Sequence, residues 1–141
     1  MTNSDLTTVP VPVPTPTSAP FWEALRRGEL HLQRCARCLA WVYYPRVRCP
    51  TCLSNDLQWQ PVDPVGTVYS FTVATRPTAP MFQDEVPQVI AIVELAIGVR
   101  ITTTLVVDDP AAVHVGLAVT GVFDPVADDI TLLRFRPTAD R

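Results

Sequence analysis

The chain has 141 residues, a formal net charge of −3, no lysine and a hydrophobic fraction of 48%. This length allows one ordinary domain, or a small metal-stabilised module joined to a second module of roughly 80 residues. The charge is uneven, because residues 21–60 carry six arginines against three acids and residues 61–141 carry five arginines against ten acids. An acidic C-terminal module argues against a nucleic-acid groove there, since such grooves are positively charged.

Within residues 1–17, positions 9–16 alternate valine or threonine with proline, and the whole segment offers little apolar surface to bury. This composition predicts a disordered, proline-rich tail, or an extended arm that lies along a partner. The first residues contain no basic stretch followed by an apolar stretch, so we expect no secretory signal. The longest apolar run, residues 86–107, is interrupted by Glu94 and Arg100 and alternates like paired strands, so it is not a membrane span. We expect a cytoplasmic protein.

A short helix is predicted to begin at Ser18, a favourable cap, and to end at Gly28. Pro20 suits its first turn because proline has no N–H to donate there. The helix has an apolar face that must pack either on this chain or on another one. That face consists of Phe21, Trp22 and Leu25.

All four cysteines lie in two C-x2-C pairs, Cys35/Cys38 and Cys49/Cys52, separated by ten residues. Each pair can place two sulfurs on one tight turn, and four thiolates suit a tetrahedral structural zinc ion. Iron bound by the same sulfurs would give the same spacing. Four thiolate ligands leave no open position for an activated water, so the metal would stabilise the fold and perform no chemistry. Strands are predicted at residues 30–34, 41–44 and 57–62, which completes a rubredoxin-like zinc ribbon.

Five further strand-like segments follow Gly66, at residues 67–76, 88–95, 99–107, 119–123 and 130–136. Gly98 favours a tight hairpin between the second and third, and residues 108–113 leave room for one helical turn before the fourth. Residues 124–129 are predicted to form a polar turn. The order matches an OB-fold barrel, although another small β-barrel would give a similar pattern. We therefore predict a mainly β protein with a helix and zinc ribbon at residues 18–63 and a five-stranded OB-fold barrel at residues 64–137.

The sequence contains no nucleotide-binding, nucleophile-elbow or HExxH motif. His31 lies in a predicted strand and His114 lies beside the predicted turn at Gly116, and we interpret both as partly exposed structural residues. Glu94, in an apolar strand, either points to solvent or pairs with Arg100. Catalysis by this chain alone is not predicted. One hypothesis is a single-stranded nucleic-acid binder, since OB folds and arginine-bearing zinc ribbons both bind nucleic acids, but the acidic barrel opposes it.

A second hypothesis comes from a resemblance spread across both predicted modules. Its motifs are Pro20-Phe-Trp-Glu-Ala-Leu25, Gly28-Glu-Leu30, the two cysteine pairs, Tyr44-Pro-Arg46, Trp59, the strand that starts at Gly66, and Val93-Glu-Leu-x-x-Gly98. In this order the chain resembles the domain-of-unknown-function 35 family over about residues 19–136. Leu39 departs from the family pattern, which usually has glycine there, and the segment around Asp63 also differs.

The resemblance implies a helix, a rubredoxin-like ribbon and an OB barrel that accompany a thiolase-like enzyme acting on acyl-CoA. It implies an accessory subunit of an aldolase, such as one that removes a steroid side chain as propionyl-CoA, or of an acyltransferase. The partner would supply the catalytic groups, and this chain would stabilise it and help form the CoA-ester channel. Acyl-CoA binding by this chain alone is a weaker alternative. Residues expected to contact CoA or the partner are Arg34, Arg37, Arg46, Arg48, Phe21, Trp22, Leu25, Met81 and Phe82.

Overall fold

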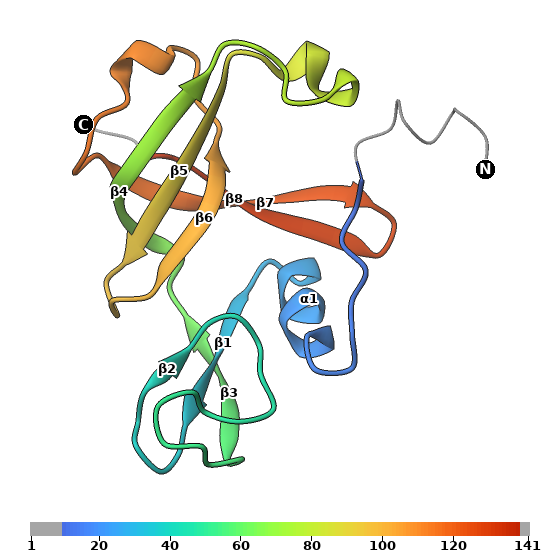
Figure 1. Ribbon diagram of the computed structural model, residues 1–141, viewed down its shortest axis with the longest axis vertical. Helices are drawn as coiled ribbons and strands as arrows, with labels where there is room; N and C mark the ends of the chain where they lie inside the picture. The colour runs from blue at the N-terminus through green and yellow to red at the C-terminus, as the bar shows by residue number, and fades with distance from the viewer. Residues whose placement is uncertain (1–9, 139–141) are drawn as a thin grey trace.

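The computed structural model describes residues 10–138 as a helix, a three-stranded sheet and a closed five-stranded barrel (Figure 1). Helix α1 spans Ala19–Arg26, and the small sheet contains β1 (Leu30–Cys35), β2 (Trp41–Val42) and β3 (Leu57–Val62) in the order β2-β1-β3. Most of the predicted tail, residues 1–9, lies outside the described residues. Residues 15–18 form a turn in which the Thr15 amide donates to Ser18 Oγ at 2.9 Å, immediately before the helix.

The barrel follows directly after the small sheet. Its strands are β4 (Val65–Ala74), β5 (Gln88–Leu95), β6 (Arg100–Leu105), β7 (Ala118–Ala127) and β8 (Ile130–Pro137). They close in the order β4-β5-β6-β8-β7, with β6 and β8 parallel and the other neighbours antiparallel. This is the strand order of an OB fold, in which the first strand pairs with both the second and the fourth.

Strand β4 can pair on both sides because of Gly66, which lies opposite Leu95 in β5 and Val119 in β7. A Cβ atom at Gly66 would overlap the backbone carbonyl of Glu94, so a side chain there would separate the strands. A bulge between Val68 and Ser70 lets the same strand bend around the barrel.

Two 3₁₀ helices connect barrel strands. Helix η2 (Pro80–Glu85) lies within the β4–β5 loop, where no element was predicted. Helix η3 (Pro110–Ala112) occupies the predicted helical turn before the fourth barrel strand, and Asp109 caps it by accepting from the Ala111 amide at 3.0 Å.

The predicted turn over residues 124–129 is wrong in length. Strands β7 and β8 remain paired as far as Ala127 and Ile130, so only two residues form the turn. Asp128 and Asp129 in this turn are exposed, at the tip of a long hairpin that projects from the barrel. Figure 1 shows this hairpin, in red and orange, extending beside α1.

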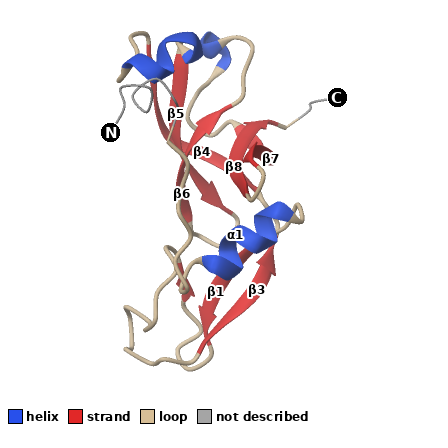
Figure 2. Cartoon of the chain, turned by 90° about the vertical axis from the view of Figure 1, so that its right-hand side faces the viewer, coloured by secondary structure: helices blue, strands red, loops and turns tan. Residues whose placement is uncertain are grey.

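One hydrophobic core runs from the barrel into the helix. Phe135 in β8 is fully buried, as are Val68 and Val93 in the facing strands, and the same cluster includes Phe21 and Leu25 of α1. Helix α1 packs on β1 and on the β7–β8 hairpin, and Figure 2 shows it between the small sheet and the barrel. The predicted fold class is therefore confirmed: a short helix, a zinc-ribbon region and an OB-like barrel.

Candidate functional site

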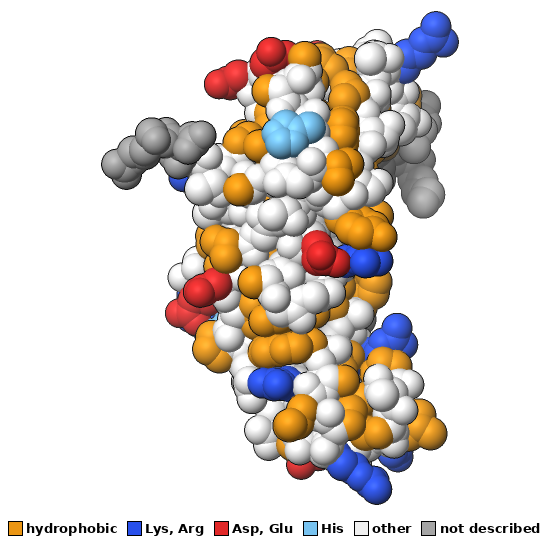
Figure 3. Space-filling model, turned by 90° about the vertical axis from the view of Figure 1, so that its left-hand side faces the viewer, with side chains coloured by type: hydrophobic (Ala, Val, Ile, Leu, Met, Phe, Trp, Pro, Cys, Tyr) orange, Lys and Arg blue, Asp and Glu red, His pale blue; other side chains and the backbone are white. Residues whose placement is uncertain are grey.

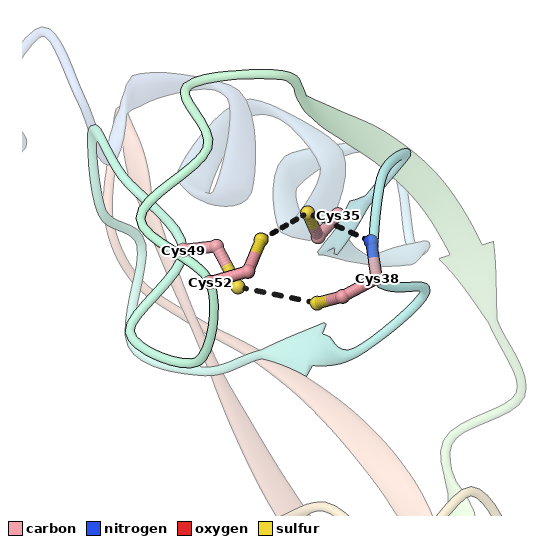
Figure 4. A group of neighbouring side chains, drawn as sticks. All are labelled: Cys35, Cys38, Cys49 and Cys52. Carbon is pink, nitrogen blue, oxygen red and sulfur yellow. Dashed lines mark hydrogen bonds between the residues drawn. The ribbon is translucent and has the colours of Figure 1, made fainter.

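The four cysteines come together at the end of the small sheet. Their sulfur atoms all lie within 4.8 Å of one another and point toward one centre (Figure 4). Cys35 Sγ lies 3.5 Å from Cys52 Sγ, and Cys38 Sγ lies 3.6 Å from Cys49 Sγ. Sulfurs around a tetrahedral zinc ion at ~2.3 Å are separated by about 3.8 Å, so the donor set fits a metal ion of this kind.

Backbone amides are aimed at two of these sulfurs. The Cys38 amide approaches Cys35 Sγ at 3.5 Å, and the Thr51 amide approaches Cys49 Sγ at 3.4 Å. Hydrogen bonds from backbone amides, that of Cys38 first, lower the pKa of Cys35 to about 6 despite its burial. The pKa of Cys49 is also lowered, mainly by the Cys52 amide. The first cysteine of each turn therefore favours the thiolate, which is the protonation state that a metal ion requires.

The pKa of Cys38 shifts in the opposite direction. Although the Ala40 amide lowers its pKa, desolvation and the neighbouring sulfurs together raise that pKa to about 12. Four thiolates so close together repel one another, and a bound cation removes that repulsion. The cluster is thus arranged to bind a positive ion rather than to remain a set of free thiols.

The two cysteine turns share the same sequence motif and the same hydrogen bond. Each has the sequence Arg-Cys-x-x-Cys-Leu, and in each the arginine folds back onto the carbonyl of the leucine. Arg34 Nε donates to Leu39 O at 3.0 Å, and an Arg48 guanidinium nitrogen donates to Leu53 O at 3.2 Å. Both arginines therefore help to hold their turns in shape, in addition to any role at the surface.

Both leucines adopt the left-handed backbone conformation, with φ of 66° at Leu39 and 65° at Leu53. Glycine takes this conformation freely, whereas leucine is strained in it. The side chains gain nothing from burial in return, because Leu39 is 60% exposed and Leu53 is 69% exposed. The sequence analysis identified only Leu39 as a leucine at a position where the family usually has glycine. The second site at Leu53 could have been found from the repeated motif.

Gln33 holds the loop between the turns and was missed by sequence reasoning. Its side chain is 4% exposed and pairs with the backbone of Arg46, accepting from its amide at 2.8 Å and donating to its carbonyl at 2.9 Å. The Arg46 side chain is exposed, as is that of Arg37. A glutamine in an alternating strand gives no local signal that it will bond to a loop thirteen residues later.

The predicted apolar contact residues are not all on the surface. Phe21 is 7% exposed and Leu25 is 1% exposed, because both pack into the shared core. The structure therefore assigns these two residues to packing within the chain. Trp22 and Phe82 are half-buried, and Met81 is half-buried in η2.

A cavity of about 820 Å³ brings four of these residues together with others from distant parts of the sequence. Phe21, Trp22 and Leu25 form one wall, and Phe82 from the β4–β5 loop lies at another side. The floor is the outer face of β5, β6 and β8, and Tyr43 and Tyr44 of the ribbon close the remaining side. Met81 and the four ribbon arginines do not line this cavity.

The remaining candidate residues form local pairs. Glu94 Oε2 accepts from Arg100 Nε at 3.0 Å, on the exposed side of the barrel, and the same guanidinium lies 3.8 Å above the ring of Tyr69. His31 Nε2 lies 2.8 Å from Glu29 Oε1, and His114 Nδ1 lies 3.1 Å from the Val115 carbonyl. No helix among residues 10–138 is long and apolar enough to cross a membrane.

Fold and site define the class of protein: a rubredoxin-like ribbon with a four-cysteine site, joined to an OB barrel. Comparison with known proteins agrees, since the rubredoxin-like zinc ribbon domain of ChsH2 matches residues 22–58 and the C-terminal OB-fold domain of ChsH2 matches residues 59–124. A DUF35 domain-containing scaffold protein from Methanothermobacter thermautotrophicus is 34% identical over 106 residues, which cover 74% of this chain and 78% of the relative. The chain belongs to the DUF35 family.

Two further similarities concern enzyme complexes. A probable enoyl-CoA hydratase alpha subunit from Thermomonospora curvata is 40% identical over 120 residues, which are 83% of this chain and 36% of the relative. The chain thus spans only about a third of that relative's length. A solved chain of the Ltp2–ChsH2(DUF35) aldolase is 36% identical, with a TM-score of 0.80 and coverage of 89% of this chain and 98% of the other.

Proposed function

We propose that this chain is a non-catalytic accessory subunit of a thiolase-like acyl-CoA enzyme, either an aldolase or an acyltransferase. The observation that carries the proposal is the match to a chain of the Ltp2–ChsH2(DUF35) aldolase, which extends over 98% of that chain. The archaeal relative is named a scaffold protein, which also supports an accessory role. In this assignment the partner supplies the catalytic groups, and this chain stabilises the partner and helps to form the channel for the CoA ester.

The metal in this proposal is zinc, held by Cys35, Cys38, Cys49 and Cys52. Sulfur-only donors and a tetrahedral spacing support zinc, with iron as the alternative that the same ligands accept. The ion holds the two turns together and takes no part in the chemistry. Four ligating thiols also fit a reducing compartment, so we place the protein in the cytoplasm.

We further assign partner binding to the ribbon end, on a surface that we call the knuckle face. It consists of the exposed side chains of Leu39, Val47, Leu53, Arg37 and Arg48. Figure 3 shows arginines beside hydrophobic side chains in the lower part of the molecule. Exposed leucines held in a strained conformation suggest a surface kept for contact, and adjacent arginines favour a partner with acidic side chains or the phosphates of CoA.

The finer assignment is a retro-aldol cleavage of a CoA ester, with a steroid side chain as one candidate substrate. The test is co-expression with a thiolase-like protein encoded beside this chain, followed by gel filtration and an assay of CoA-ester cleavage. We expect a stable complex that cleaves the ester and no cleavage by this chain alone. Independent elution of the two proteins, or turnover by the lone chain, would overturn the proposal.

A single-stranded nucleic-acid binder remains the competing hypothesis because the cavity lies on the OB face that binds oligonucleotides in other proteins. Titration of a labelled oligonucleotide at low salt distinguishes the two. Binding that weakens steeply with added salt would favour the nucleic-acid hypothesis. Calorimetric titration with an acyl-CoA tests the third alternative, a CoA-ester binder that acts alone.

A further inference from the structure

Strand β3 forms one free edge of the small sheet (Figure 1). The strand order is β2-β1-β3, so β3 pairs with β1 on one side and has no strand on its other side among the described residues. The opposite edge is β2, which has only two residues, whereas β3 has six. An edge strand of this length presents a row of unpaired backbone N–H and C=O groups to which another strand can bond.

The hydrogen bonds of the sheet show which backbone groups of β3 face that edge. The Ala36 amide donates to the Asp56 carbonyl at 2.9 Å, and this pair continues the register of β1 and β3. In an antiparallel ladder, hydrogen-bonded pairs alternate with pairs that are not hydrogen-bonded. The even-numbered residues of β3 therefore bond to β1. The odd-numbered residues point their amides and carbonyls outward, and they are Leu57, Trp59 and Pro61.

Two further observations support this assignment. Proline has no N–H to donate, so Pro61 fits best at a position that faces away from β1. Within residues 10–138, no backbone hydrogen bond uses the outward amides of Leu57 and Trp59. The edge thus offers these two amides as donors and the carbonyls of all three residues as acceptors.

This edge is complementary to itself. If two copies of β3 lie antiparallel with Trp59 opposite Trp59, each Trp59 amide meets a Trp59 carbonyl. In the same register each Leu57 amide meets the Pro61 carbonyl of the other copy. All outward donors then have acceptors, although Pro61 can return no N–H to Leu57. A shift of the register by two residues either shortens the overlap or places Trp59 opposite Pro61, so the register centred on Trp59 is favoured.

The side chains of β3 also suit self-pairing. The strand carries no charged residue, so two copies meet without like-charge repulsion within the strand. Gln58 would lie opposite Gln60 of the second copy, where the two side-chain amides can bond to each other. Leu57 and Trp59 are half-buried and would lose part of their remaining exposure. Edge strands that stay unpaired commonly carry charges that prevent such contacts.

We propose that two copies of this chain pair through β3, which joins their three-stranded sheets into one sheet around a two-fold axis. None of the knuckle-face residues lies in β3, so each copy keeps that face for a partner enzyme. The inference concerns a second surface and does not depend on the proposed function. One strand pair is a small interface, so we expect a weak dimer that forms at about 100 µM and above.

The direct test is sedimentation equilibrium of the full zinc-loaded chain from ~5 µM to ~1 mM. The mean mass should rise from that of one chain toward that of two. Hydrogen exchange at the same concentrations identifies the surface. Exchange of the Leu57 and Trp59 amides should slow by about tenfold when about nine-tenths of the chain is dimeric, whereas the Gln58 amide, bonded to β1, should keep its rate. A single-chain mass at ~1 mM, or a dimer that leaves both edge amides unprotected, would overturn the inference.

Charged substitutions give the matched test. Gln58→Arg with Gln60→Arg places like charges opposite one another across the pair and should abolish the dimer, and Gln58→Glu with Gln60→Glu should do the same. An equimolar mixture of the two double variants should restore the dimer, because opposite charges then face each other. Restoration also shows that neither variant had misfolded.

Ser70→Arg with Thr72→Arg is the control, because it adds the same charge at exposed positions of β4, where β5 is already paired. This variant should dimerise like the unmodified chain. No restoration in the mixture, or an equal loss in the control, would show that the copies do not meet through β3.

A partner enzyme is the other occupant that these experiments can reveal. If the Leu57 and Trp59 amides become protected only when a thiolase-like protein is added, the edge pairs with that protein and self-pairing is wrong. If the chain dimerises through β3 but forms no complex with such a protein, the inference stands and the proposed function fails. The two proposals are therefore tested separately on the same preparation.

Discussion

The two ends of this molecule are stabilised in different ways. The barrel closes around a continuous apolar core in which Phe135 is fully buried, and that core extends into α1. At the ribbon end the buried cluster contains only Cys35, Val42 and Cys49, and two of those three residues are candidate metal ligands. A core so small cannot offset the loss of chain entropy by itself. The barrel is therefore held by packing, and the ribbon end depends on its ion.

Removal of the metal should give the largest effect. A structural zinc ion bound by four thiolates contributes on the order of 10–16 kcal/mol at neutral pH. Cys49→Ser should therefore abolish stoichiometric zinc binding and remove hydrogen-exchange protection around both cysteine turns, while amides of β5 and β6 remain protected. Plasma mass spectrometry and hydrogen exchange measure the two effects.

Thr51→Ala is the control for this experiment, because Thr51 is exposed in the same turn and supplies only its backbone amide. It should retain one ion per chain. If Cys49→Ser unfolds the barrel as well, the two ends form one cooperative unit, and the barrel is not stabilised independently of the metal ion.

Truncation of a core side chain should destabilise the barrel and leave the ribbon end intact. Phe135→Ala removes a ring from the centre of the barrel and should lower the free energy of unfolding by about 3–5 kcal/mol, measured in urea. Zinc stoichiometry under native conditions should not change, because the cysteine turns share no buried contact cluster with Phe135. Phe135→Leu, which keeps most of the volume, should cost much less. Loss of zinc from the folded alanine variant would contradict this separation.

Gln33 should give an intermediate effect at the ribbon end. Gln33→Ala leaves the amide and carbonyl of Arg46 without their buried partner and should lower stability by about 2 kcal/mol. It should also weaken zinc retention against a chelator, because the loop between the turns is less constrained. Gln58→Ala, at an exposed position on β3, is the control and should change neither measurement.

The smallest effect should be a gain in stability. Leu39→Gly and Leu53→Gly relieve left-handed backbone strain at two exposed positions, and each should raise stability by up to about 1 kcal/mol in the zinc-loaded chain. If the knuckle face binds the partner, the double variant should be more stable to heat and yet bind the thiolase-like protein less tightly. A double variant with unchanged affinity would remove the two leucines from the interface.

Much of the fold was predictable because its signals are local. Two C-x2-C pairs must form tight turns if they are to share one ion, and the barrel strands, six to ten residues long, are rich in β-branched residues. The hairpin between β7 and β8 was predicted too short because Asp124 and Pro125 usually mark turns, whereas pairing across the hairpin extends both strands.

The sequence alone was therefore enough to predict the candidate metal ligands, the helix, the ribbon and the barrel. Cysteine spacing and hydrophobic periodicity are properties of a few neighbouring residues, so they can be recognised without the tertiary structure. Only the tertiary structure decided that Phe21 and Leu25 are buried within the chain, that Gln33 holds a distant loop, and that Trp22, Tyr43, Phe82 and Arg134 line one cavity. These residues come from separate elements, and their meeting depends on how α1 and the ribbon pack across the barrel. No pattern within one element records that packing.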